Sequence, residues 1–274
     1  MSLWLAIDVS YLAWRAHYTT GTLTNGVAFG VLREIRSLCG RFVPSKVCFA
    51  FDIGRSKRAK LYPDYKRRGI RTEEQQLANL QVSDAIDSLR QNHLPALGFT
   101  NFFYQSGYEA DDIIASIVHN RESKTQEVVI VSADHDLYQL LDDEETVGIW
   151  QPNKKRMLTG RSFELLYGIS CHSWPTVKAI AGCKSDNIRG VIGVGEKTAI
   201  KYLNAVGTYI SKKPKVFQKI EEDWDDVLER LKLVKLPFEG TNLCIPNGKD
   251  KVTDRKWNDL YERLGFKSLL ERSK

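Results

Sequence analysis

Three kinds of feature are missing from this 274-residue sequence. No apolar run approaches the roughly 18 residues that a membrane-spanning helix needs, so we expect no membrane association. The apolar stretch at residues 3–7 is short, lacks a basic leader and runs into Asp8, which argues against a signal peptide. The cysteines are odd in number and form no C-x-x-C pair, which predicts reduced thiols in a cytoplasmic protein rather than a disulfide scaffold or zinc site. They are Cys39, Cys48, Cys171, Cys183 and Cys244.

The composition is that of an ordinary globular protein, with 42% hydrophobic and 27% charged residues. The length allows one large domain, or a domain with a satellite. The net charge of +6 is concentrated between residues 54 and 71, where eight basic residues face one acid, Asp64. This segment suits a polyanion such as nucleic acid, although a solvated charged loop explains it about equally well.

Three short apolar runs, at residues 3–7, 47–51 and 128–131, have strand character and are followed by aspartates. Their hydrophobicity is continuous rather than alternating, which is typical of parallel strands that are covered on both faces. Apolar residues at helical spacing lie between the first two runs and again after residue 112. Strands that alternate with helices predict an α/β fold.

The aspartates that follow these runs are Asp8, Asp52, Asp134 and Asp136. In open parallel sheets the carboxyl ends of the strands meet at one edge, where ligands bind. A single aspartate at such a place is usually a helix cap or a turn residue. Several carboxylates brought together repel one another unless protons or cations neutralise them, so we predict a metal site.

Two more acidic groups lie further along the chain. Glu109, Asp111 and Asp112 directly precede a helix, and three acids in four residues exceed what helix capping needs. Asp186 forms the second group.

A glycine-rich turn follows at residues 190–199, where Gly193 and Gly195 precede Lys197 between two helical patterns. Glycines permit a close approach of the backbone, and the next helix presents free N–H groups to an anion. Gly-x-Gly alone is weak evidence. With the flanking helices and the lysine it has the form of a helix–hairpin–helix clamp for backbone phosphates.

Taken in order, the segments GYEADD at 107–112, SADHDLYQL at 132–140 and SDNIRGVIGVGEKTA at 185–199 resemble the flap-endonuclease, or 5′-3′ exonuclease, family. The family includes the 5′-nuclease domain of bacterial DNA polymerase I and stand-alone phage and bacterial enzymes. The resemblance implies a PIN-like α/β core, with a parallel-type twisted sheet flanked by helices and a helical arch near 54–90. It divides the chain into a catalytic core at 1–172 and a DNA-binding region at 173–274. That region would hold a helix-3-turn-helix with a potassium ion at 190–195, and C-terminal helices that pack back on the core.

The resemblance also implies roles for individual residues. Lys66 matches the arch lysine that contacts the scissile phosphate, and Tyr65 is expected to stack on an unpaired base. The first metal site would use Asp8, Asp52, Glu109, Asp111 and Asp112, with Asp134 close by, and the second would use Asp136 and Asp186. DNA contacts are expected from Arg15, Tyr65, Lys66, Arg67, Arg68, Arg71, Gly193, Gly195 and Lys197.

Two positions depart from the family pattern. The glycine usual after the first aspartate is Val9, which changes a turn without removing a ligand. The family has an acid three residues before Asp186, where this sequence has Cys183 followed by Lys184. A thiol is a soft and usually protonated group that suits magnesium poorly, so the second ion should bind weakly.

The expected activity is hydrolysis of DNA at 5′ ends, flaps and single-strand/duplex junctions with Mg²⁺ or Mn²⁺. Lys66, Asp8 and Asp134 are the expected catalytic residues. The alternatives are a DNA-binding relative with weak or lost catalysis, a PIN-type ribonuclease, and a metal-dependent phosphatase suggested by the Asp134-x-Asp136 pair. The DNA-gripping C-terminal region disfavours the last two. We expect a monomer in a bacterial or phage-infected cell, with a replication polymerase as a partner in trans.

Overall fold

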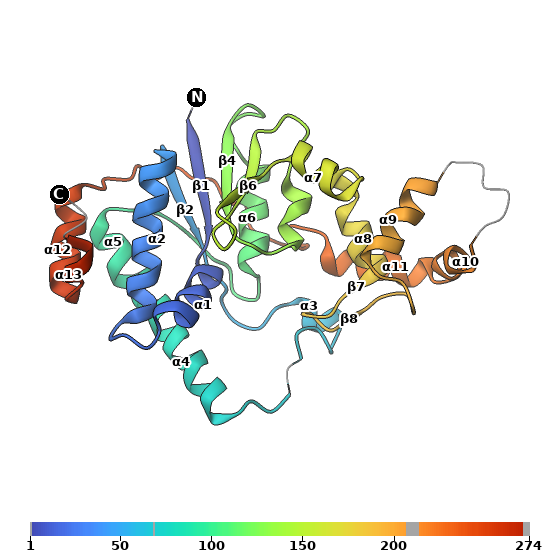
Figure 1. Cartoon of the computed structure of the whole chain (residues 1–274), viewed down its shortest axis with the longest axis horizontal. Coiled ribbons are helices and arrows are strands. Elements are labelled where there is room, and N and C mark those ends of the chain that lie inside the picture. Colours follow the sequence, from blue (N-terminus) through green and yellow to red (C-terminus); the bar gives the residue numbers. More distant parts are fainter. Residues whose placement is uncertain (1, 68, 207–213, 271–274) are drawn as a thin grey trace.

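The computed structural model describes residues 2–67, 69–206 and 214–270, and its centre is a six-stranded sheet of order β3-β2-β1-β4-β5-β6 (Figure 1). Neighbouring strands from β3 to β5 pair in parallel, and β6 pairs with β5 in the antiparallel sense. The strands are β1 (Leu3–Asp8), β2 (Lys46–Ala50), β3 (Asn101–Phe103), β4 (Glu127–Val131), β5 (Val147–Gln151) and β6 (Arg156–Leu158). The predicted α/β sheet is confirmed, with an antiparallel edge strand that the sequence analysis did not foresee.

Both faces of the sheet are buried, which explains the continuous hydrophobicity of the strands. In β1, Leu5 and Ile7 pack on one face, whereas Trp4 and Ala6 pack on the other. The first face is covered by α1 (Val9–Thr20), α2 (Gly26–Phe42) and the C-terminal helix α12 (Asp254–Leu264). The second face is covered by α6 (Ala110–His119) and, further along, by α8 (Trp174–Ala181). The predicted helices around residues 27–39 and after residue 112 are therefore α2 and α6.

The basic segment at residues 54–71 lies between β2 and the next long helix in the chain. It holds the short helix α3 (Arg58–Leu61), and it leads to α4 (Glu73–Ser88), which extends away below α1 in Figure 1. Thr72 and Gln75 form a capping box that starts α4. After α4 the chain passes through the π-helical turn η1 (Leu89–His93) and α5 (Leu94–Leu97) into β3.

The C-terminal half begins with α7 (Gly160–Tyr167) and then places a two-stranded hairpin between two helices. The hairpin pairs β7 (Gly182–Cys183) with β8 (Ile188–Arg189) and connects α8 to α9 (Glu196–Ala205). The next helices are α10 (Lys215–Glu222) and α11 (Trp224–Val234), and α11 packs on α8. The chain then returns to the first face of the sheet, where Trp257 and Tyr261 of α12 are buried.

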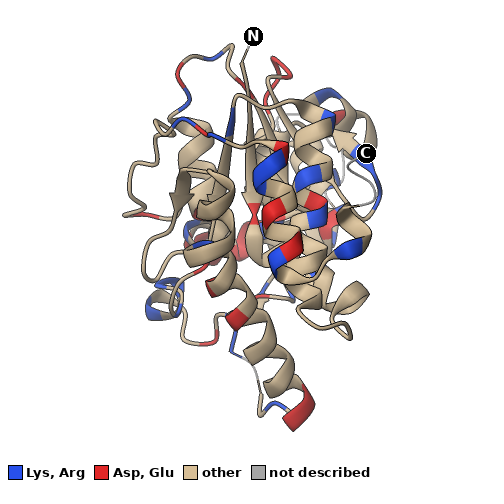
Figure 2. Cartoon of the chain, turned by 90° about the vertical axis from the view of Figure 1, so that its left-hand side faces the viewer, with Lys and Arg blue, Asp and Glu red and all other residues tan. Residues whose placement is uncertain are grey.

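The C-terminal segment that follows the return to the sheet holds two helices. Gly265 ends α12 in the left-handed conformation, with φ 74°, and a separate helix α13 (Lys267–Leu270) follows. On this side of the molecule, acidic and basic residues are interspersed along the helices (Figure 2), as in the ion pair of Arg36 with Asp254. Among the described residues no helix is long and apolar enough to cross a membrane.

Candidate metal centre

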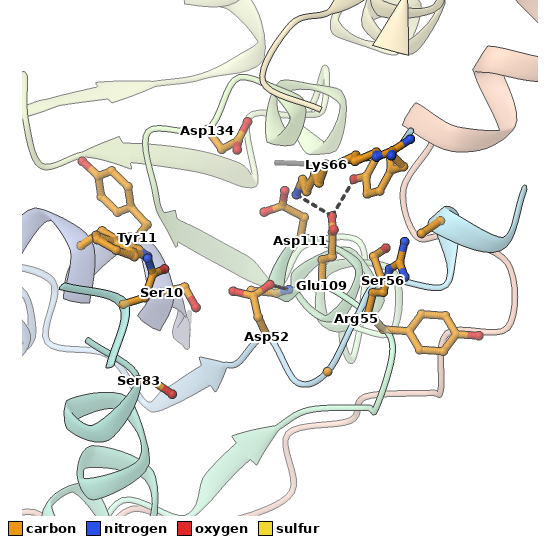
Figure 3. A pocket seen from close by; sticks show the side chains of 18 of the residues that line it. Ser10, Tyr11, Asp52, Arg55, Ser56, Lys66, Ser83, Glu109, Asp111 and Asp134 are labelled. Atoms are coloured by element: carbon orange, nitrogen blue, oxygen red, sulfur yellow. Dashed lines mark hydrogen bonds and ion pairs between the residues drawn. The ribbon is translucent and has the colours of Figure 1, made fainter. Parts of the chain in front are cut away.

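A cavity of about 1420 Å³ opens at the carboxyl edge of the sheet, lined by both the predicted carboxylates and the basic segment. In Figure 3, Asp52, Asp111 and Asp134 point toward this space from different elements. Asp8 ends β1 and lines the same cavity. The fold therefore brings Asp8, Asp52 and Asp134 to one cavity, whereas Asp136 belongs to a neighbouring cluster.

Local hydrogen bonds fix the orientation of each carboxylate. The Asp8 carboxylate accepts from the N–H of Tyr11 at 2.9 Å, as the N-cap of α1, and from the Ser132 hydroxyl at 3.0 Å. Asp52 accepts from the Ala110 N–H at 2.8 Å. Asp134 accepts from the Asp136 N–H at 2.8 Å. Each carboxylate thus accepts hydrogen bonds from the nearby backbone. These bonds do not explain why several carboxylates lie together.

The electrostatics of the cluster favour a bound cation. Burial and the nearby Asp52 and Asp134 together raise the pKa of Asp8 to about 7, against the hydrogen bonds from Tyr11 and Ser132, which lower it. Burial and the charge of Asp136 raise the pKa of Asp134 to about 6, against a hydrogen bond that lowers it. The pKa of Asp111 is raised by burial, and then by Asp134 and Asp8. Oxygen ligands that repel one another in this way fit a hard divalent ion, which would neutralise them.

Glu109 holds the lysine that the sequence analysis singled out. Lys66 Nζ lies 3.0 Å from Glu109 Oε2, and the Tyr65 hydroxyl donates to the same oxygen at 2.9 Å (Figure 3). Burial alone would lower the pKa of Lys66, but Tyr65, Glu109 and Asp186 outweigh it and raise that pKa. Lys66 is therefore a fixed ammonium group at the rim of the carboxylate cluster.

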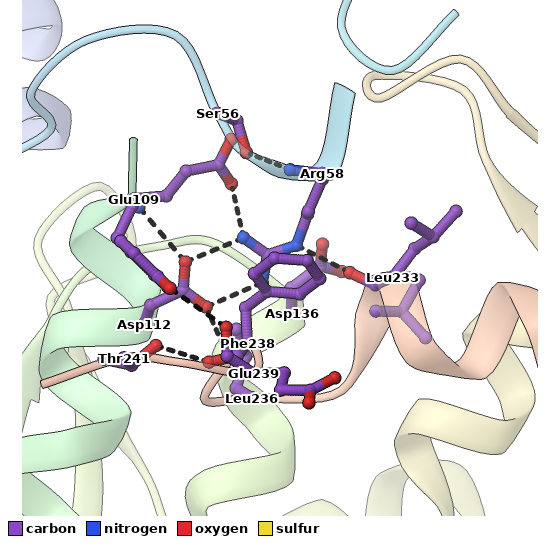
Figure 4. A network of polar contacts seen from close by, with 12 residues as sticks. Ser56, Arg58, Glu109, Asp112, Asp136, Leu233, Leu236, Phe238, Glu239 and Thr241 are labelled. Atoms are coloured by element: carbon purple, nitrogen blue, oxygen red, sulfur yellow. Dashed lines mark hydrogen bonds and ion pairs between the residues drawn. The ribbon is translucent and has the colours of Figure 1, made fainter. Parts of the chain in front are cut away.

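Asp112 does not fit its predicted role as a metal ligand. It is fully buried, and its two oxygens pair with the Arg58 guanidinium at 2.6 and 2.7 Å (Figure 4). The same oxygens also accept from the N–H groups of Phe238 and Glu109, at 2.8 and 3.1 Å. Every acceptor position of this carboxylate is thus occupied by a structural partner, and Arg58 is withdrawn from any contact with DNA.

Tyr65 also departs from its predicted role. Only 5% of its surface is exposed, and its hydroxyl is bound to Glu109. Its ring is therefore buried and cannot stack on an unpaired base. In this structure it supports Glu109 instead.

The other predicted DNA contacts are distributed around the cavity and the hairpin. Arg67 and Arg71 line the cavity, whereas Arg15 pairs with Glu34 at 3.3 Å. Arg68 lies outside the described residues. Gly193 has φ 80°, Gly195 is the N-cap of α9, and Lys197 is exposed in the first turn of that helix.

A second acidic cluster lies next to the first. One potential ligand atom each of Asp136, Cys183 and Asp186 lies within 4.8 Å of the others. The Cys183 Sγ lies 2.9 Å from the Ser185 hydroxyl and 3.4 Å from Asp186 Oδ2. Burial raises the pKa of the Cys183 thiol, and the nearby Asp136 adds to this. With a neutral thiol in place of an acid, this cluster offers a second hard divalent ion only two carboxylates, fewer than the first cluster.

Sequence reasoning missed a lysine in this cluster. Lys178 of α8 is 7% exposed, and its Nζ lies 3.1 Å from Asp136 Oδ1 and 3.6 Å from Glu196 Oε1. Lys184, which follows Cys183 in the sequence, is exposed. The signal that could have revealed Lys178 is a single charged residue in the otherwise apolar helix WPTVKAIA.

The architecture is that of the PIN-like 5′-nucleases: a mainly parallel sheet flanked by helices, with carboxylates converging at its carboxyl edge. A family profile described as "5'-3' exonuclease, N-terminal resolvase-like domain" matches residues 3–168, more than half of the chain. The chain therefore belongs to the 5′-3′ exonuclease family.

The chain is similar to part of much longer curated proteins. It is 31% identical to DNA polymerase I of Mycobacterium tuberculosis over 216 residues, which cover 74% of this chain and 23% of that protein. It is 30% identical to DNA polymerase I of Bacillus caldotenax over 286 residues, which cover 97% of this chain and 32% of that protein. The chain thus spans a third or less of the length of these relatives.

Solved structures share the fold over the whole chain. A structure of the bacteriophage T5 flap endonuclease with DNA and metal ions aligns with a TM-score of 0.74 at 22% identity, covering 97% of this chain and 100% of that one. The zinc-bound 5′-exonuclease of the same phage aligns with a TM-score of 0.73 at 22% identity over all of both chains.

Proposed function

We propose that this chain is a metal-dependent 5′-nuclease that hydrolyses DNA phosphodiesters at 5′ ends and flap junctions. The observation that carries the proposal is the convergence of Asp8, Asp52, Asp111 and Asp134 on one cavity, with the Lys66 ammonium at its rim. Membership of the 5′-3′ exonuclease family and the similarity to DNA polymerase I support the same reaction.

We assign one divalent ion, Mg²⁺ or Mn²⁺, to the four aspartates and to Glu109. Tyr65, Lys66 and, at 3.6 Å, Arg58 all contact Oε2 of Glu109, and this carboxylate completes the proposed set of oxygen ligands. When bound, such an ion supplies a water deprotonated near neutral pH and offsets charge on the phosphate. Lys66 then contacts the scissile phosphate and stabilises its growing negative charge. The aspartates hold the ion in place through their oxygens.

The DNA substrate is assigned to two surfaces. The first is the basic segment, where Arg55, Arg67 and Arg71 line the cavity. The second is the turn between the hairpin and α9, where Gly193, Gly195 and Lys197 would bind duplex phosphates and a potassium ion as a helix-3-turn-helix. The corresponding division of the chain is a catalytic core at 1–172, with an arch near 54–90, and a DNA-binding region at 173–274. We further propose a monomer that meets a replication polymerase in trans.

The test is cleavage of end-labelled 5′-flap DNA, blunt duplex DNA and single-stranded RNA with Mg²⁺ or Mn²⁺. Asp111→Asn is the matched control, because it removes one charge and keeps the side-chain size. Metal-dependent cutting of the flap and of duplex 5′ ends, lost in the control, supports the proposal. Cleavage of RNA alone would identify a PIN-type ribonuclease. Binding of the flap without cleavage by either ion would identify a non-catalytic DNA-binding relative.

A further inference from the structure

The second acidic cluster contains its own positive charges. Lys178 Nζ lies 3.1 Å from Asp136 Oδ1, and Lys66 Nζ lies 3.7 Å from Asp186 Oδ1. Each of these two carboxylates thus has an ammonium group within 4 Å, although Lys66 also pairs with Glu109 and Lys178 with Glu196. The third member of the cluster, Cys183, is an uncharged thiol. In contrast, the carboxylates that line the first cluster outnumber the basic side chains that line it. Among these basic side chains, Lys66 also reaches the second cluster. The two neighbouring clusters therefore have very different attraction for a divalent ion.

The position of Lys178 is built into the fold. It extends from α8, whose Trp174, Val177 and Ile180 are completely buried, and the lysine itself is 7% exposed. Glu196, at the start of α9, lies 3.6 Å from the same ammonium. A lysine with two carboxylate partners and little solvent around it is costly to displace, because Asp136, whose side chain is only 17% exposed, would lose this counter-charge.

We infer that Lys178 takes the place of the second divalent ion, so that this chain binds one metal ion in the first cluster and a fixed ammonium group in the second. This inference rests on the proposed nuclease function and assigns the state of its second metal position. The Lys178 ammonium neutralises Asp136 and keeps the cavity wall beside Asp134 from becoming more negative. Cys183 fits this arrangement because both ammonium groups already pair with carboxylates. A third acid at this position would have no counter-charge.

The inference makes a specific claim about which residue excludes the second ion. If the thiol alone were responsible, Cys183→Asp would be enough to create a second site. If the ammonium is responsible, the Lys178 charge still excludes the ion in Cys183→Asp. A second ion then binds only when both Lys178 and the thiol are replaced. Lys178→Met retains the length and the apolar stem of the side chain and removes only the charge.

The experiment counts Mn²⁺ ions bound to the full chain without DNA, by electron paramagnetic resonance of the free ion during titration. The wild type and Cys183→Asp should each bind about one ion, and Lys178→Met with Cys183→Asp should bind about two. Cys183→Ser combined with Lys178→Met is the matched control and should stay near one, because it adds no carboxylate. Thermal melts of all variants check that they are folded.

Tight binding of two ions by the wild type, or by Cys183→Asp alone, would overturn the inference. A double variant that is folded and still binds only one ion would do the same. Lys178→Gln with Cys183→Asp provides the count if the methionine variant does not fold. Flap cleavage by the wild type is measured in parallel, so two bound ions with cleavage would reject only this inference. Absence of cleavage at any metal concentration would reject the proposed function itself.

Discussion

The main-chain N–H of Lys66 donates a 2.9 Å hydrogen bond to the carbonyl oxygen of Asp186. The basic segment and the β7–β8 hairpin are therefore joined directly at the lysine proposed to contact the scissile phosphate. Asn187, in the left-handed conformation with φ 58°, strengthens this link. Its side-chain amide donates to the carbonyl oxygens of Asp64 and Arg67, at 3.2 and 2.6 Å. The hairpin thus holds the backbone on both sides of Lys66, which itself has φ 49°.

Asn187 is predicted to be a positioning residue for Lys66. Asn187→Gly removes both side-chain hydrogen bonds but keeps the left-handed backbone accessible. We expect the single-turnover rate on flap DNA to fall about tenfold, because loss of one or two hydrogen bonds of about 1 kcal/mol each loosens the lysine. The KM for DNA should change little.

A double-mutant cycle separates positioning from a general structural effect. In a Lys66→Ala background, Asn187→Gly should have almost no further effect on the rate, because the group that it positions is absent. Two effects that simply multiply would show that Asn187 acts independently of Lys66.

Lys66 is predicted to stabilise the transition state rather than to bind DNA in general. Lys66→Ala should lower the single-turnover rate by about 10²-fold or more, which is typical for loss of an electrostatic stabiliser. The dissociation constant of flap DNA in Ca²⁺ should stay nearly constant. Arg67→Ala is the matched control, since it removes an exposed charge one residue away. A weaker binding constant with an unchanged rate would reduce Lys66 to one phosphate contact among several.

The sequence was sufficient to predict three strands of the sheet and the aspartates at their ends, because both depend on strong local patterns. Continuous apolar runs that end in aspartate define β1, β2 and β4, and parallel topology then brings Asp8, Asp52 and Asp134 to one edge. The roles of Asp112 and Tyr65 were mispredicted because they depend on partners distant in sequence. Arg58, more than fifty residues from Asp112, occupies that carboxylate. No local pattern carries such information.

Arg58 and Asp112 are predicted to be essential for folding and not for chemistry. Arg58→Met should lower the free energy of unfolding by about 3–5 kcal/mol, because it leaves the fully buried Asp112 carboxylate without its partner. It also removes the 2.7 Å hydrogen bond from Arg58 Nε to the carbonyl oxygen of Leu233 in α11. Urea denaturation followed by circular dichroism provides the measurement.

The comparison variant for this pair is Arg58→Met with Asp112→Asn, which removes the buried negative charge as well. It should regain part of the lost stability, since no uncompensated ion remains. Equal destabilisation by the single and the double change would contradict the assignment of the cost to the unpaired carboxylate.

The pH dependence of stability should report the carboxylate cluster, and its sign follows from the raised pKa values. In the metal-free protein the pKa values of Asp8 and Asp134, about 7 and about 6, lie above the value of 3.8 for a free aspartate. The folded protein therefore holds these protons more tightly than the unfolded chain. Their stabilising contribution is fully present below about pH 4 and is lost as pH rises through 6 to 7. A divalent ion binds the deprotonated cluster and competes with the protons.

The increase in melting temperature caused by Mg²⁺ should consequently be small at about pH 5.5 and large at about pH 8. Asp8→Asn tests the cause, because asparagine keeps the N-cap of α1 and removes the charge. Without metal, this variant should be more stable than the wild type at about pH 8, and the difference should be clearly smaller at about pH 5. Its Mg²⁺-dependent increase should be much smaller at the higher pH. Calorimetric scans at the two pH values give both quantities, and a Mg²⁺ effect that is independent of pH in the wild type would show that these carboxylates do not hold the ion.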